Sequence, residues 1–351
     1  MEAQIANGLI PWWSTDFGEP EKKAVCNAID GKHISQGSVT RAFEILLAET
    51  LGVPYVVCTT SGTTALTMAL LACGIGRNDE VVVPDRTWIA TAHAVMMTGA
   101  DVALADVTES EPTLGEFLVH KNTKAVLPVS LNGRPLPCHP DTEQALKRKG
   151  IAHIEDLCQA FPASPKSDIA CYSLSVAKII STGQGGFCAT RDEALYKELL
   201  ALRTHDVADA MVPAVLEWKR FGYNFRFTDI QAAIGLAQLD RLPSRLAAIA
   251  EIHAEYKRAG VPVLETPTPL YNELLHVEPE ALRSHLRESG IEARPFYPSL
   301  HTAPYLQAKG EFPNSEKFSK GLFLPSGPCQ KIEDIKKVCA AIYEFNSRRY
   351  F

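Results

Sequence analysis

The segment Ser173-Leu174-Ser175-Val176-Ala177-Lys178, which continues as Ile-Ile-Ser-Thr-Gly-Gln-Gly-Gly at 179–186, decides the fold class of this chain. It places a lysine where a strand runs into a loop, just before a glycine-rich turn. Upstream, an apolar strand pattern ends in Asp156. Alone, each residue has an ordinary explanation, as a solvated lysine or a capping aspartate, but together they indicate pyridoxal phosphate (PLP) chemistry. Lys178 would form a Schiff base with the cofactor, and Asp156 would keep the pyridine nitrogen protonated so that the ring acts as an electron sink.

Length and composition describe a globular protein of two domains. The chain has 351 residues, 46% hydrophobic and 22% charged, which suits two cores rather than one small one. Its net charge is −6 and no arginine- or lysine-rich run marks a nucleic-acid partner. The nine cysteines form no C-x-x-C pair and no zinc-finger spacing, so we expect reduced thiols and no metal site. No signal peptide or membrane-spanning run is visible, and we therefore expect a cytoplasmic protein without a membrane partner.

Helix and strand patterns alternate from about residue 63. This alternation predicts an α/β fold with a large, mostly parallel sheet and helices on both faces. The pattern changes near residue 245, where we expect a smaller α+β domain that includes strands at 261–264 and 293–297. The expected division is a large PLP-binding domain with the N-terminal segment at 1–244 and a small C-terminal domain at 245–351.

Glycine and hydroxyl residues gather at the start of a predicted helix, in Ser61-Gly62-Thr63-Thr64. Free backbone N–H groups and the helix dipole favour an anion such as a phosphate there. The ordinary alternative is a Ser/Thr helix cap. Ser173, five positions before Lys178, carries a hydroxyl that is expected to bind the same phosphate, the alternative being a satisfied strand hydroxyl.

Three other polar or aromatic residues lie near predicted element ends. Trp88 follows the strand at 80–84, and at the carboxyl end of a strand an aromatic ring can stack on a planar ligand or fill an apolar junction. Gln159, three residues after Asp156, is expected on the same side of the turn, within reach of a ring hydroxyl. Asn224 stands just before a helix that opens at Thr228, and its ordinary role is turn formation.

These segments, in this order, resemble the DegT/DnrJ/EryC1/StrS family of PLP-dependent sugar aminotransferases. The resemblance runs from Ile10-Pro11 to Leu324-Pro325 and is strongest at 61–66, 74–84, 154–160, 182–186 and 222–231. The segments at 293–298 and 301–305 look most like those of perosamine synthases, which aminate a GDP-linked 4-keto-6-deoxy sugar. The chain departs from the family at Ser-Leu-Ser-Val-Ala-Lys, where S-F-H-P-T-K is frequent, and at Gly-Gln-Gly-Gly, where Gly-Glu-Gly-Gly is frequent.

The resemblance implies the aspartate aminotransferase-like PLP fold (fold type I) and a role for each site residue. Lys178 is the Schiff-base lysine and Asp156 the partner of the ring nitrogen. Gln159 faces the ring hydroxyl and Trp88 stacks on the ring. The residues implied to hold the cofactor phosphate are Gly62, Thr63, Thr64 and Ser173, together with Asn224 of the other subunit. The implied assembly is a homodimer with shared active sites.

The expected reaction moves an amino group, from glutamate as the expected donor, to a keto group of a nucleotide-linked sugar. The expected substrate contacts are Ser35, Gln36, Arg294 and His301. The ordinary alternative for Arg294 is a surface salt bridge. A PLP-dependent dehydratase, an amino-cyclitol transaminase and a non-catalytic PLP-binding regulator remain open, although relatives that dehydrate carry His where this chain has Lys178.

Overall fold

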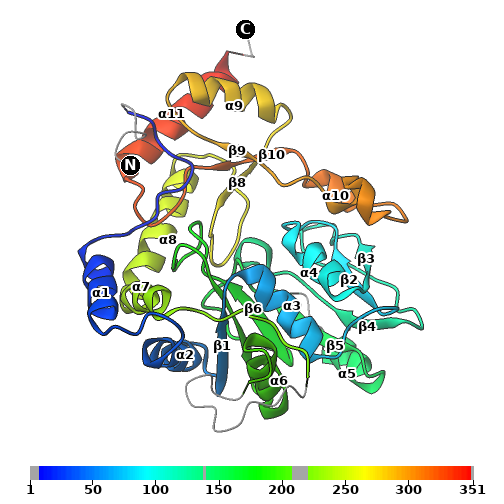
Figure 1. Cartoon of the computed structure of the whole chain (residues 1–351). Helices are drawn as coiled ribbons and strands as arrows, with labels where there is room; N and C mark the ends of the chain where they lie inside the picture. Colours follow the sequence, from blue (N-terminus) through cyan, green and yellow to red (C-terminus); the bar gives the residue numbers. More distant parts are fainter. Residues whose placement is uncertain (1–7, 137–139, 208–219, 349–351) are drawn as a thin grey trace.

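A seven-stranded sheet forms the centre of the larger part of the molecule (Figure 1). The computed structural model describes residues 8–136, 140–207 and 220–348. The strand order is β1-β7-β6-β5-β4-β2-β3, and only β7 runs antiparallel to its neighbours within this sheet. The strands are β1 (Tyr55–Thr59), β2 (Glu80–Pro84), β3 (Asp101–Ala105), β4 (Thr123–Val126), β5 (Ala152–Asp156), β6 (Ile169–Ser173) and β7 (Gly186–Thr190). The predicted mostly parallel sheet is confirmed.

Helices cover both faces of this sheet because its strands carry apolar side chains on both sides. In β1, Val56 and Cys58 join one hydrophobic cluster while Val57 joins the cluster on the opposite face. The first cluster lies under α2 (Ser38–Leu51) and α7 (Asp229–Asp240), and the second under α3 (Gly62–Ala72), α4 (Ala90–Thr98) and α6 (Glu193–Arg203). Helix α1 (Glu19–Asp30) packs on α7, and α5 (Pro140–Arg148) packs on β5.

The smaller sheet has the order β8-β10-β9, with antiparallel pairs (Figure 1). Its strands are β8 (Asn272–Leu275), β9 (Arg294–Pro295) and β10 (Gly321–Leu324). Its core is shared with α8 (Leu242–Arg258), α9 (Pro279–Glu288) and α11 (Ile332–Ser347). The remaining short helices are α10 (Pro313–Lys317) and the 3₁₀ turns Leu131–Gly133, Leu300–Thr302 and Pro304–Leu306.

Two strands predicted in this part are shorter in the structure than expected. The expected strand at 261–264 is reduced to one bridge between Val263 and Leu274, and the one at 293–297 to the two residues of β9. Each stretch contains a proline, Pro262 or Pro295, and a proline has no N–H to donate to a ladder, which weakens pairing there.

The division at residue 244 stays a prediction. Helix α8 begins at Leu242 and crosses that point without a break. The N-terminal segment lies against the smaller sheet, where Ile10 bridges Ile291 and Trp13 bridges Ser326 (Figure 1).

Among residues 8–136, 140–207 and 220–348, no helix combines the length and the hydropathy needed to cross a membrane. Within the same ranges no group of three or more His, Cys, Asp or Glu side chains is arranged to hold a metal ion. The eight described cysteines are free thiols, and Cys138 lies outside the described residues.

Candidate active site

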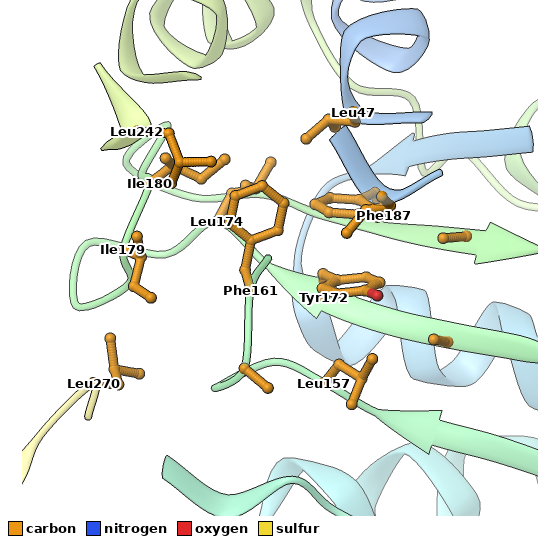
Figure 2. Packing of buried hydrophobic residues seen from close by; sticks show 14 of the residues in the cluster. Leu47, Leu157, Phe161, Tyr172, Leu174, Ile179, Ile180, Phe187, Leu242 and Leu270 are labelled. Carbon is orange, nitrogen blue, oxygen red and sulfur yellow. The ribbon is translucent and has the colours of Figure 1, made fainter. Parts of the chain in front are cut away.

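The loop that carries Lys178 is fixed on both sides by the core. It follows β6, and Lys178 itself is half-buried. The next two residues, Ile179 and Ile180, are buried with Leu174 in the cluster beneath α2 and α7 (Figure 2). The hydroxyl of Tyr271 donates a hydrogen bond to the carbonyl oxygen of Ala177 at 3.0 Å. The backbone around the lysine is therefore held in place while its side chain remains accessible.

Asp156 ends β5 and is 4% exposed. Its Oδ2 accepts a hydrogen bond from the Thr91 hydroxyl at 2.9 Å, and its Oδ1 accepts one from the backbone N–H of Cys158 at 3.1 Å. No lysine, arginine or histidine of the described residues forms an ion pair with this carboxylate. A buried carboxylate held only by neutral donors fits a cationic ligand group, and the protonated pyridine nitrogen of PLP is such a group.

The start of α3 packs directly against the end of β6. A Cβ added at Gly62 would lie 2.9 Å from Cβ of Ser173 and 3.0 Å from Sγ of Cys158, so the close approach requires glycine. The Ser173 hydroxyl oxygen accepts the N–H of Ser175 at 3.4 Å. The structure thus brings two of the predicted phosphate residues together at a helix N-terminus, where an anion is favoured.

The two threonines of this turn differ in what they contact. The side chain of Thr64 serves the helix cap: its hydroxyl donates to the carbonyl oxygen of Ser61 at 2.8 Å, and its N–H donates to the Ser61 hydroxyl at 3.1 Å. Thr63 is half-buried and its carbonyl oxygen accepts the Thr67 hydroxyl at 3.0 Å. The helix cap, which was the ordinary alternative to a phosphate site here, is formed by Ser61 and Thr64.

Trp88 is 53% exposed and meets Tyr297 edge-on, with the ring centroids 5.1 Å apart. Burial raises the pKa of the Tyr297 hydroxyl well above its usual value, and the positive charge of Lys178 opposes that rise. Burial also raises the pKa of the Cys158 thiol, again with Lys178 opposing. Tyr297 and Cys158 therefore belong to the surroundings of Lys178, although the sequence analysis assigned neither to the site.

Gln159 is buried, at 6% exposure, and its Oε1 accepts the backbone N–H of Asn132 at 2.9 Å. Asn132 was not among the residues predicted from the sequence. No local signal marks it, because its contacts are long-range.

Arg294 and His301 have protein partners of their own. Arg294 is exposed, lies 4.2 Å over the ring of Trp12 and pairs with Glu292 at 3.3 Å, which is the surface salt bridge considered as its alternative. The Nδ1 of His301 lies 2.8 Å from Oδ2 of the fully buried Asp85, whose Oδ1 accepts the His301 backbone N–H at 2.7 Å. This pair holds the imidazole of His301 at the end of β2, because Asp85 directly follows that strand and precedes Trp88 by three residues.

Ser35, Gln36 and Asn224 lie apart from these contacts. Ser35 is exposed, and its carbonyl oxygen accepts the N–H of Asp229 at 3.0 Å. Gln36 lines a cavity of about 830 Å³ that also touches Thr204, the backbone partner of Asn224, but neither Lys178 nor Asp156 lines it. The side chain of Asn224 is exposed.

Comparison with known proteins assigns the chain to a family. The model of the DegT/DnrJ/EryC1/StrS aminotransferase family matches residues 15–343. GDP-perosamine synthase of Escherichia coli O157:H7 is 33% identical over 363 aligned positions, which cover 96% of this chain and 99% of that protein. GDP-perosamine synthase of Caulobacter vibrioides is also 33% identical, over 92% of this chain and 94% of that protein.

Solved structures agree with this assignment. DesV of S. venezuelae, solved in complex with a ketimine intermediate, superimposes with a TM-score of 0.84 at 28% identity, covering 93% of this chain and 94% of that one. A DegT DnrJ EryC1 StrS aminotransferase from Brucella abortus gives a TM-score of 0.82 at 27% identity, covering 93% and 95%. The fold type I architecture implied by the sequence is confirmed. The chain belongs to the DegT/DnrJ/EryC1/StrS aminotransferase family.

Proposed function

We propose that this enzyme is a PLP-dependent aminotransferase that moves an amino group from glutamate to the keto group of a nucleotide-linked deoxy sugar. Two features together carry the proposal: a Lys178 whose loop is anchored in the core, and a buried Asp156 that has only neutral hydrogen-bond donors. The nucleotide-sugar class is supported by the two GDP-perosamine synthases that are 33% identical over more than nine-tenths of the chain. Its reduced thiols suit a cytoplasmic enzyme.

Each site residue has a chemical task in this proposal. When bound, PLP supplies an electron sink that stabilises negative charge on the carbon of the amino compound. Lys178 would hold the cofactor through its Nζ, and once free again this amine would take a proton from one carbon and return it to another. Asp156 keeps the ring nitrogen protonated, and Trp88 covers the ring with an apolar face. The N–H groups at the start of α3, with the Ser173 hydroxyl, hold the phosphate.

A half-reaction with glutamate tests the proposed activity without the sugar. The purified protein, loaded with PLP, should convert glutamate to 2-oxoglutarate and its own cofactor to pyridoxamine phosphate in equal amounts. Absorbance spectra follow the cofactor and mass spectrometry follows the keto acid. A non-catalytic regulator would leave both unchanged. An amino-cyclitol transaminase would also pass this test. To separate the classes, GDP-, UDP- and dTDP-linked keto sugars are then offered to the protein whose cofactor carries the amino group. A sugar aminotransferase would aminate one of them, whereas a dehydratase would remove water from the sugar without aminating it.

We further propose that the active unit is a homodimer in which Asn224 binds the cofactor phosphate of the other subunit. Two observations support this arrangement. The Asn224 side chain is exposed in the single chain, and the neighbouring cavity of about 830 Å³ is large enough to receive a short segment of a second copy. In the competing arrangement Asn224 serves its own chain, because the next residue, Phe225, already accepts the hydroxyl of Thr59 at 3.1 Å beside the phosphate turn.

Subunit mixing separates these arrangements. A dimer of Lys178→Ala and a dimer of Asn224→Ala should both be weak, the second because a lost phosphate contact costs roughly 1.5–3 kcal/mol. After exchange, each mixed dimer has one intact and one doubly damaged site if the sites are shared. Activity should then exceed the sum of the parents. If mass spectrometry shows exchange while activity stays at that sum, Asn224 acts within its own chain.

A further inference from the structure

Asn132 lies at the centre of a buried polar network that reaches Gln159. Its side chain is 0% exposed and its backbone is left-handed, with φ 53° and ψ 39°. Asparagine tolerates this conformation better than most residues. The Asn132 N–H donates to Oε1 of Gln159 at 2.9 Å, and its carbonyl oxygen accepts the Thr266 hydroxyl at 2.6 Å. The turn that holds Gln159 is thus itself held from the smaller sheet's side of the molecule.

The side chain of Asn132 is bound entirely by β8 and the residue before it. Its Oδ1 accepts the N–H of Tyr271 at 2.7 Å, and its Nδ2 donates to Oε2 of Glu273 at 2.7 Å and to the Tyr271 carbonyl at 2.9 Å. Arg134 completes the network through a buried ion pair with Glu273 at 2.7 Å. Each polar atom of the Asn132 amide has a partner, so its position is fixed by charge-assisted and backbone hydrogen bonds.

The backbone N–H of Asn132, which this network holds in place, determines which way the Gln159 amide points. A backbone N–H can only donate, so the atom of Gln159 that faces Asn132 must be the oxygen. The donor Nε2 is then on the other branch of the amide. From that branch, Nε2 could donate a hydrogen bond to a negatively charged ring oxygen of the cofactor.

We propose that Asn132 is a positioning residue that fixes the Gln159 amide with its Nε2 toward the cofactor ring and ties this orientation to β8. The inference rests on the proposed function and deepens it. If Asn132 acts in this way, the affinity for the cofactor and the charge state of its ring oxygen both depend on Tyr271 and Glu273, which lie on the smaller sheet's side of the network. Neither residue needs to touch the cofactor for this dependence to hold.

The test is Asn132→Gly, with Asn272→Ala as its matched control. Glycine keeps the left-handed turn and every backbone donor and removes only the side-chain bonds to the β8 region. Asn272 is an equally buried asparagine between Tyr271 and Glu273, but its bonds go to Ser326 and His253. Both variants damage the same region, and only the first touches the network.

Two readouts independent of turnover are measured on the PLP-loaded proteins: the Kd for PLP, and the pH midpoint of the bound cofactor's absorbance change. Asn132→Gly should raise the Kd roughly 10-fold. It should also raise the midpoint by about one pH unit, because a turn that is no longer tied to β8 does not hold the Gln159 donor against the ring oxygen, whose charge is then less stabilised after the lysine linkage loses its proton. Asn272→Ala should lower the Tm and leave the midpoint unchanged.

Opposite outcomes overturn the inference. It is wrong if Asn132→Gly keeps the wild-type midpoint, or if Asn272→Ala shifts the midpoint as much. Should Asn132→Gly not fold, Glu273→Gln serves in its place and must shift the midpoint in the same direction by a smaller amount; an unshifted midpoint contradicts the inference. If the wild-type protein binds no PLP, that result would contradict the proposed function rather than the role of Asn132 alone.

Discussion

Asp156→Asn is expected to retain PLP and to slow transamination by several orders of magnitude. The neutral amide cannot keep the pyridine nitrogen protonated, so negative charge on the reacting carbon is no longer delocalised into the ring. The packing should survive, because the amide oxygen can still accept from the Cys158 N–H and the Thr91 hydroxyl can rotate to accept from the amide. Single-turnover rates with glutamate measure the effect.

The preceding residue provides the control. Glu155 is also a buried carboxylate of β5, but its Oε2 accepts the backbone N–H groups of Lys166 at 2.8 Å and Ser167 at 3.1 Å. Glu155→Gln should lower the Tm and leave the rate within a few-fold of wild type. A near wild-type rate for Asp156→Asn, or an equal loss for Glu155→Gln, would reject the pairing of Asp156 with the ring nitrogen.

Lys178→Ala is expected to abolish turnover, by roughly 10⁴-fold or more, since it removes both the anchor of the cofactor and the group that moves the proton. The control is Lys337→Ala, because the Lys337 side chain is 67% exposed and forms an ion pair with Asp334 at 2.7 Å on α11. Steady-state rates with glutamate and a keto sugar give the comparison. Retained activity in Lys178→Ala would show that another residue carries the reaction.

Local features of the sequence were sufficient to predict the large sheet and to propose the centre of the candidate site. Asp156 could be placed because an apolar run ends at it, and Gly62 because a Ser/Thr-rich turn opens a helix there. Both features depend on neighbours within a few positions. The same reasoning placed strands at 261–264 and 293–297, where a proline weakens the pairing in each stretch and the pairing partners lie further along the chain.

Contacts between residues far apart in the sequence could not be predicted from local patterns. Asp85 meets His301 across 216 positions, and Asn132 meets Tyr271 across 139. The pattern around Asn132 is that of an ordinary Asn-Gly turn, and nothing in it shows that the turn is buried or faces Gln159. Tyr297 was seen only as part of a matching segment, since its closeness to Trp88 follows from how the two sheets meet.

Reductive trapping tests the central claim most directly. Borohydride reduction of the PLP-loaded protein should fix the cofactor covalently to one lysine, and peptide mapping by mass spectrometry identifies it. The account predicts a single labelled site at Lys178, and prior incubation with glutamate should prevent the labelling because the cofactor then leaves as the amine. A label on any other lysine, or bound PLP that reduction does not attach to the chain, would contradict it.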